Sequence, residues 1–174
     1  MSNRPTDQEY APFYAGYVDR APEEDVAAAL EAQSHYTLEI LNEFDDEQAS
    51  ILRGTTQWTL KETLGHLCDA ERVFAYRAMR IARGDKTPLP GFEQDDYVAG
   101  GSFNDRDWDD QIAEYSALRQ ATIAFARGTK PEHLERMGTA SEKPVSARAL
   151  LYITVGHERR HIELIRQHAG TNVE

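Results

Sequence analysis

The sequence predicts an all-α fold, a four-helix bundle with a long crossover loop and an irregular N-terminal arm. Four segments of about 20 residues carry apolar side chains at steps of three and four, the spacing of a helix with one buried face. No segment alternates polar and apolar residues over a convincing length. At 174 residues the chain is most simply one domain spanning 1–174, with an arm at 1–20 and a helical bundle at 22–168.

The arm at 1–20 contains Pro5 and Pro12, which interrupt it, and shows no helical or strand period. It also carries four aromatic residues, Tyr10, Phe13, Tyr14 and Tyr17. These are too many for a free tail, so we expect the arm to pack across the domain or across a partner subunit.

The first helix is predicted over 22–45. Pro22 and the acidic residues after it suit a first helical turn, where proline fits and carboxylates complement the helix dipole. Gln33 and Thr37 fall within the apolar stripe. They indicate either polar groups near a central cavity or two polar residues tolerated at the margin of the stripe.

The second helix is predicted from Thr59 to Arg83. Thr59 and Glu62 form a capping-box pattern, and Gly84 is a typical helix stop. Its buried side is marked by Leu60, Leu64, Leu67, Ala70, Phe74 and Ala78. His66 lies at the edge of this stripe.

Residues 84–104 are rich in proline and glycine and predict a long loop, a feature that is usually functional or disordered. Its apolar residues need cover, so we expect an ordered loop over one end of the bundle, either a lid or a packed connection.

The third helix is predicted from residue 104 or 105 to 127, ending at Gly128. One or two helical turns are expected over 131–137, and Ser146 then caps a fourth helix.

Acidic residues outnumber basic ones by 30 to 19, for a formal net charge of −11, which opposes binding to nucleic acid. Arginines cluster on two predicted helices, but solvated faces paired with acidic residues explain them more simply. These clusters are Arg72, Arg77, Arg80 and Arg83, and Arg159, Arg160 and Arg166. The single cysteine, the polar N-terminus and the lack of an apolar run near 18 residues predict a cytoplasmic protein that is not in a membrane.

His157 and His161 lie four residues apart on the fourth helix. Such residues share a face with Cβ atoms about 5–6 Å apart, so both imidazoles can reach one divalent ion. The pattern H-E-x-x-H is also that of zinc proteases. We discount a protease because Leu164 replaces the glycine of the extended motif and His168 is one position past its third histidine.

A third ligand must then come from upstream, and His66 is the best candidate. Like His157, it directly follows a glycine, which lets a facing backbone or ligand come close. Three imidazoles with a fourth position left open describe a catalytic type of zinc site.

The remaining candidate ligands fit less well. Glu158 faces about 100° away from His157 on an ideal helix, so a role behind the ligands or at the surface is favoured over that of general base. Cys68 lies on a different face from His66. The other histidines, expected at the surface or in packing, are His35, His133 and His168.

Three segments together resemble the DinB-like family, close to its YfiT-like branch of metal-dependent enzymes in the DinB/thiol-transferase superfamily. Trp58-Thr59-Leu60-Lys61-Glu62-Thr63-Leu64-Gly65-His66-Leu67 is similar to the family's tryptophan-led second helix. Leu89-Pro90-Gly91-Phe92-Glu93-Gln94-Asp95-Asp96-Tyr97 is similar to its proline-aromatic-acidic loop, and Gly156-His157-Glu158-Arg159-Arg160-His161 to its last helix.

The resemblance implies a divalent metal ion, zinc or nickel, held by His66, His157 and His161, and a homodimer. Family members include transferases that add low-molecular-weight thiols such as bacillithiol to electrophiles, and mycothiol-dependent isomerases. We therefore expect transfer of a small-molecule thiol to an electrophilic substrate, with Arg159 or Arg160 holding the carboxylates of the thiol. The alternatives are a hydrolase that uses metal-bound water and a non-catalytic, stress-related metal-binding or interaction bundle.

Overall fold

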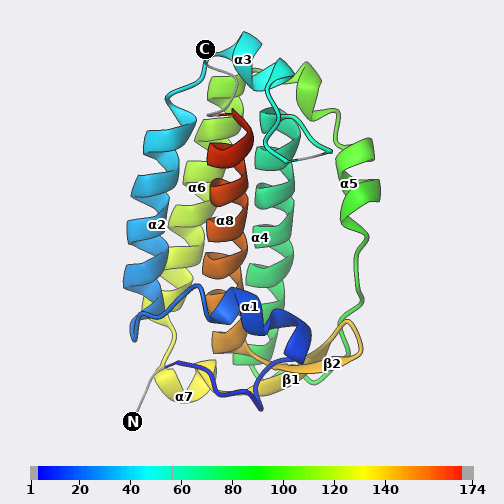
Figure 1. Ribbon diagram of the computed structural model, residues 1–174. Coiled ribbons are helices and arrows are strands. Elements are labelled where there is room, and N and C mark those ends of the chain that lie inside the picture. The colour runs from blue at the N-terminus through cyan, green and yellow to red at the C-terminus, as the bar shows by residue number, and fades with distance from the viewer. Residues whose placement is uncertain (1–3, 56, 170–174) are drawn as a thin grey trace.

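The computed structural model describes residues 4–55 and 57–169, which form the predicted four-helix bundle (Figure 1). Residues 1–3 of the predicted arm and both ends of the predicted domain 1–174 lie outside the described residues. The long helices are α2 (Val26–Leu41), α4 (Leu60–Ala82), α6 (Trp108–Gly128) and α8 (Ala147–Ala169). No helix in the described ranges combines the length and apolar character needed to cross a membrane.

The connectivity of the bundle places α4 and α6 parallel to each other. Both helices begin beside Asp46, whose Oδ1 accepts a hydrogen bond from the Trp108 backbone N–H at 2.9 Å and pairs with Lys61 Nζ at 2.7 Å. The chain between them must therefore return along the whole bundle, as Figure 1 shows. α4 packs against α6 and α8, and α2 packs against the same two helices.

The first predicted helix is wrong at both boundaries, because aspartates start two separate helices. The Asp25 side chain accepts hydrogen bonds from the first free amides of α2, so the helix begins after Asp25 and not at Pro22. α2 ends before Asn42, and Asp45 then caps a short helix, α3 (Asp46–Ile51), through a capping box with Gln48.

The starts of α4 and α8 are confirmed. Thr59 Oγ1 accepts from the Glu62 backbone N–H at 3.1 Å, while Glu62 Oε2 accepts from the Thr59 N–H at 2.8 Å. Ser146 Oγ accepts from the N–H of Ala149 at 3.0 Å. α6 begins later than predicted because a 3-10 turn, η2 (Phe103–Asp105), precedes it and Asp107 is its cap.

A β-hairpin was not predicted and is present between α7 (Pro131–Leu134) and α8. Its strands are β1 (Met137–Ala140) and β2 (Lys143–Ser146), antiparallel, with Met137 opposite Ser146. Ser141 and Glu142 form the turn with φ of 50° and 62°. Such left-handed turns normally carry glycine or asparagine, so the usual sequence signal of a hairpin is missing.

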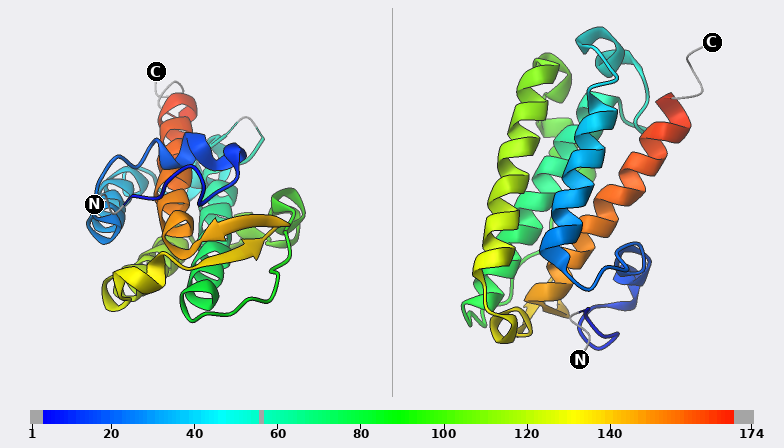
Figure 2. Two further views of the ribbon diagram at one scale, coloured as in Figure 1. Left: turned by 90° about the horizontal axis from the view of Figure 1, so that it is seen from below. Right: turned by 90° about the vertical axis from the view of Figure 1, so that its left-hand side faces the viewer.

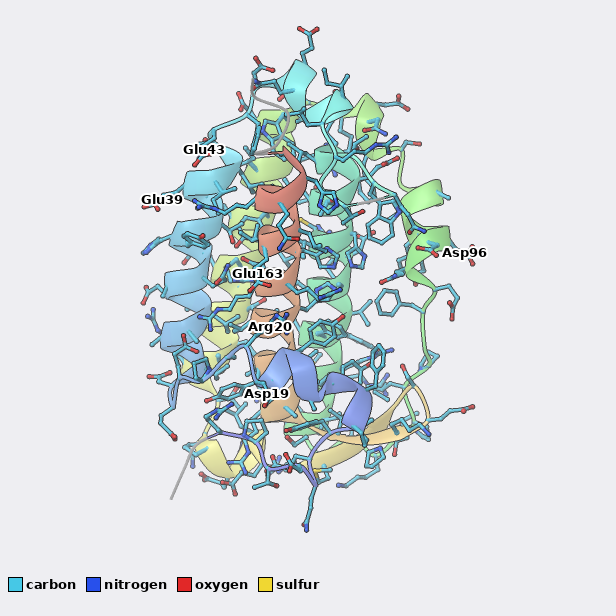
Figure 3. All side chains as sticks on the ribbon, in the orientation of Figure 1. Asp19, Arg20, Glu39, Glu43, Asp96 and Glu163 are labelled. Atoms are coloured by element: carbon cyan, nitrogen blue, oxygen red, sulfur yellow. The ribbon has the colours of Figure 1, made fainter. Side chains whose placement is uncertain are left out.

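The predicted loop at 84–104 is ordered, but it does not cover one end of the bundle. It runs beside α4 and includes a short helix, α5 (Gln94–Gly100), with Asp96 on the outer side (Figures 1 and 3). Leu89 is bonded to the hairpin through its N–H to Thr139 O at 2.9 Å. The hairpin itself lies at the end of the bundle where α8 begins, as seen in Figure 2.

The N-terminal arm packs across its own domain. After a 3-10 turn, η1 (Pro12–Tyr14), the helix α1 (Ala15–Val18) lies against α8. The two backbones are so close that a Cβ added at Gly156 would stand 1.8 Å from the carbonyl oxygen of Tyr17. Arg20 and Glu163, labelled in Figure 3, extend the contact with an Nη2–Oε2 distance of 3.6 Å.

Gly156→Ala should therefore push α1 away from α8 and lower the free energy of unfolding by about 1–3 kcal/mol, the usual cost of overpacking. Denaturant unfolding of the purified variant measures the loss. Gly128→Ala is the matched control, because nothing lies within 4 Å of an added Cβ there. Equal stability of Gly156→Ala and wild type would show that the close approach is not a tight constraint.

Candidate metal centre

The structure brings the three predicted histidines together. His66 comes from α4, and His157 and His161 from adjacent turns of α8. One ring nitrogen from each lies within 4.8 Å of the other two, and His66 Nε2 is 3.1 Å from His157 Nε2. Imidazole nitrogens bind zinc at about 2.0–2.1 Å, so two nitrogens on one tetrahedral ion stand roughly 3.3 Å apart. The spacing fits a shared ion.

Burial keeps all three imidazoles neutral. It lowers the pKa of His66 to about 4 and, helped by the nearby His66 and Arg160, the pKa of His161 to about 3. Burial likewise holds the pKa of His157 well below its usual value. Neutral imidazole is the form that binds metal, so no proton need be displaced near pH 7.

An unpartnered nitrogen supports the same interpretation. His161 Nδ1 is buried and has no hydrogen-bond partner among the described residues. Buried polar atoms without partners are uncommon and call for an explanation. A set of neutral nitrogen donors suits a metal of the zinc or nickel type, and an ion bound by the three imidazoles would explain why His161 Nδ1 has no partner in the part of the chain that the structure describes.

Aromatic rings enclose the three histidines. Trp58 is stacked on His161, with planes 14° apart and centroids 6.4 Å apart, and its centroid is 4.8 Å from that of His66. Tyr17 and Phe74 meet the His157 ring edge to face, at 5.5 and 5.8 Å. Trp58 is thus part of the site, although only the family resemblance drew attention to it.

A cavity of about 310 Å³ opens from His66 and His157. The arm, α4, the crossover and the hairpin line it. Its aromatic lining consists of Phe13, Tyr14, Tyr17, Phe74 and Phe92. A larger cavity of about 390 Å³ lies around the start of α2 and the end of α6, and none of the three histidines lines it. Of these two cavities, the one of about 310 Å³ combines the three-histidine cluster with space for a small molecule.

Glu158 is buried, so its predicted surface alternative is wrong. Its side chain accepts hydrogen bonds from Thr37 Oγ1 at 2.5 Å and from Tyr115 Oη at 2.7 Å, and it pairs with Arg119. The Glu158 side chain therefore points into the centre of the bundle. Its carboxylate, which a zinc protease would use as general base, is already engaged in these three contacts.

The same network settles the position of the two polar residues in the first helix. Gln33 Nε2 donates to Thr37 Oγ1 at 3.1 Å, and both side chains are buried. They are interior polar groups, not residues at a margin. Sequence reasoning missed Arg119 and Glu71, although Gln33 and Thr37 were a signal that a polar centre needed partners.

The two arginines expected to bind substrate differ in position. Arg159 donates to both carboxylate oxygens of Glu23, at 3.0 and 2.6 Å, and to the Arg20 carbonyl at 2.6 Å. These contacts give Arg159 a structural role between α8 and the arm. Arg160 is exposed, and its charge helps to lower the pKa of His157 and His161. Substrate binding by Arg160 stays a prediction.

The other candidates lie outside the cluster. Cys68 is buried, and burial raises the pKa of its thiol. His35 is exposed, His133 is half-buried, and His168 Nδ1 is 2.8 Å from the Leu164 carbonyl oxygen.

Comparison with known proteins identifies the family. The model of the DinB superfamily matches residues 29–165. Among solved structures, YfiT from Bacillus subtilis, described as a probable metal-dependent hydrolase with an unusual four-helix bundle topology, is similar with a TM-score of 0.64. The match covers 94% of this chain and 89% of that one at 15% sequence identity, which establishes a shared fold. Comparison with curated proteins gave no significant match. Since the family model spans most of the sequence, the chain belongs to the DinB superfamily.

Proposed function

We propose that this protein is a metal-dependent enzyme that transfers a low-molecular-weight thiol to an electrophilic substrate. In this proposal His66, His157 and His161 hold a divalent ion, zinc or nickel. The observation that supports it is the convergence of three neutral, buried imidazoles beside a cavity large enough for a small molecule. An ion held only for structure would normally have four protein ligands.

The bound ion would supply Lewis acidity, which keeps a thiol ionised near neutral pH. The protein contributes the rest. Trp58 packs against the His66 ring and Phe74 against the His157 ring. These contacts limit the movement of the two imidazoles and shield the contacted sides of the rings from water. The cavity would hold the electrophile next to His66 and His157. The thiolate sulfur would then form its bond to the electrophilic carbon as the leaving group departs with its bonding electron pair, and the thiol proton would pass to solvent.

The surroundings of Glu158 exclude one route to an activated water. In zinc proteases with the H-E-x-x-H pattern the glutamate is the general base, and here Glu158 is already bonded to Thr37, Tyr115 and Arg119. Hydrolysis would therefore rely on the ion to ionise water, as thiol transfer would rely on it to ionise the thiol.

Hydrolysis is the second candidate, because the structurally similar YfiT is described as a probable metal-dependent hydrolase. In this chain Glu93 and Asp95 lie at the rim of the cavity, where a carboxylate can take a proton from water. The expected homodimer, the cytoplasmic location and the lack of nucleic-acid binding remain predictions.

The test measures conjugation of small thiols to a generic electrophile such as 1-chloro-2,4-dinitrobenzene by zinc- or nickel-loaded protein. Ester hydrolysis is followed in parallel with 4-nitrophenyl acetate. We expect conjugation above the metal-only background and its loss in a His157→Ala/His161→Ala variant. Hydrolysis without conjugation would replace transferase by hydrolase. Neither activity in fully metal-loaded protein would favour the non-catalytic bundle.

A further inference from the structure

Arg77 is a buried cation that has no acidic partner among the described residues. Its side chain is on α4, and the residue is only 3% exposed. Nη2 donates to the carbonyl oxygen of Pro90 and, at 3.2 Å, to Ser141 Oγ. The guanidinium carbon lies 5.8 Å from the ring centroid of Phe92. All three contacts are neutral.

Three other arginines of the bundle are paired with carboxylates. The buried Arg119 stands between the carboxylates of Glu71 and Glu158. On α4 itself, Arg72 pairs with Glu114 and Arg80 with Asp85. A buried charge is costly unless it is paired, and burial lowers the pKa of Arg77 with no carboxylate to oppose the effect. Since the described residues supply no counter-ion, a bound ligand is a source of one.

The position of Arg77 indicates where a counter-ion would bind. Arg77 lines the same cavity as His66 and His157. His66 and Arg77 are eleven residues apart, about 16 Å along a helix axis, and Ala70 and Phe74 line the cavity between them. The guanidinium lies beside the Phe92 ring, which packs at 6.5 Å against Phe74, and Phe74 in turn contacts His157.

The free donors of Arg77 match an oxyanion. Nη2 makes both printed bonds, while Nε and Nη1 donate to no described residue. Guanidinium groups bind carboxylate and phosphate through two parallel N–H groups. The acidic Glu93 and Asp95 at the cavity rim and the net charge of −11 repel a phosphate dianion more than a single carboxylate.

We propose that Arg77 binds the carboxylate of a small organic acid whose apolar part lies against the aromatic wall of the cavity and reaches toward the three histidines. The role of Arg77 rests on the proposed function in one respect, which is that the reaction takes place at those histidines. It assigns the substrate class, a small molecule with an apolar body and a carboxylate remote from the reacting atom.

Binding of 3-phenylpropionate, 3-phenylpropionamide and inorganic phosphate to the full chain tests this assignment. Calorimetry gives the affinities, with and without zinc. In isotope-labelled wild type, the Nε–H resonance of Arg77 reports the contact directly. Arg77→Met removes the charge, Arg77→Lys keeps it without the planar fork, and Arg83→Met is the control on the same helix, since Arg83 is exposed and stacks on Phe125.

We expect 3-phenylpropionate to bind at least tenfold more tightly than either 3-phenylpropionamide or inorganic phosphate. Its binding should also shift the Arg77 Nε–H resonance. Arg77→Met should lose at least tenfold in affinity, Arg77→Lys less, and Arg83→Met nothing. The proposal is overturned if the carboxylate leaves the Arg77 resonance unmoved, if phosphate binds as well as the acid, or if a folded Arg77→Met binds like wild type. Carboxylate binding is also measured without metal. It therefore tests the role of Arg77 even if the metal-loaded protein shows no thiol transfer.

Discussion

Replacing His157 and His161 with alanine should reduce bound zinc or nickel from about one ion per chain to almost none, because one histidine of the three would remain. Among the described residues, the ring nitrogens that converge within 4.8 Å come from three histidines, two of which are lost in this variant. Elemental analysis of wild type and variant, purified in parallel and reloaded with the same metal, measures the change.

His133→Ala/His168→Ala is the matched control, since it also removes two histidines but leaves the cluster intact. It should keep the metal content of wild type. His66→Gln is a useful third variant, because it removes a ligand from the other helix with a smaller change of volume. Metal retained in both ligand variants, with helical circular dichroism unchanged, would place the ion elsewhere. Wild type that takes up neither metal would remove the basis of the proposed enzyme.

The fold was predictable where local chemistry and hydrophobic period agree. Thr59 with Glu62, and Ser146, mark helix starts whose caps the structure contains. The errors at the boundaries of the first helix came from aspartates that cap helices. Asp25, not Pro22, sets the start of α2, and Asp45 starts a new helix where the apolar stripe predicted that the first helix continues. Which residue starts a helix is decided by backbone geometry, which the sequence shows only indirectly.

The histidine cluster was predictable because two of its members, His157 and His161, are four residues apart on α8. The residues that surround the cluster were not predictable. Gly65 and Gly156 did indicate close approach, and the groups that come close are the Phe103 ring and the Tyr17 carbonyl. Neither partner can be read from the sequence, because both come from segments without a period. For the same reason the sequence groups Arg77 with the arginines of a solvated face, whereas the crossover and the hairpin bury it.

Arg119→Met should lower the free energy of unfolding by about 3–5 kcal/mol, the usual result of removing one partner of a buried ion pair. Arg119 is fully buried, bonded to Glu71 through Nε and Nη2 at 2.8–3.2 Å, and paired with Glu158. Without it, two carboxylates face each other in the bundle centre with no cation between them. For a chain of this size the melting temperature should fall by roughly 6–20 °C.

Arg127→Met is the control, because its ion pair with Glu31 is exposed and such pairs contribute at most about 1 kcal/mol. Glu71→Gln/Arg119→Met/Glu158→Gln should recover much of the loss, since it leaves no unpaired charge in the interior. If Arg119→Met were no less stable than Arg127→Met, the central ion-pair network would contribute little to the free energy of unfolding.

The Arg119→Met substitution should also affect metal binding. Glu158 directly follows His157 on α8, so a displaced Glu158 should make the position of the His157 imidazole less fixed. Metal content of folded Arg119→Met should therefore fall below that of Arg127→Met, which connects the stability of the interior to the integrity of the proposed centre.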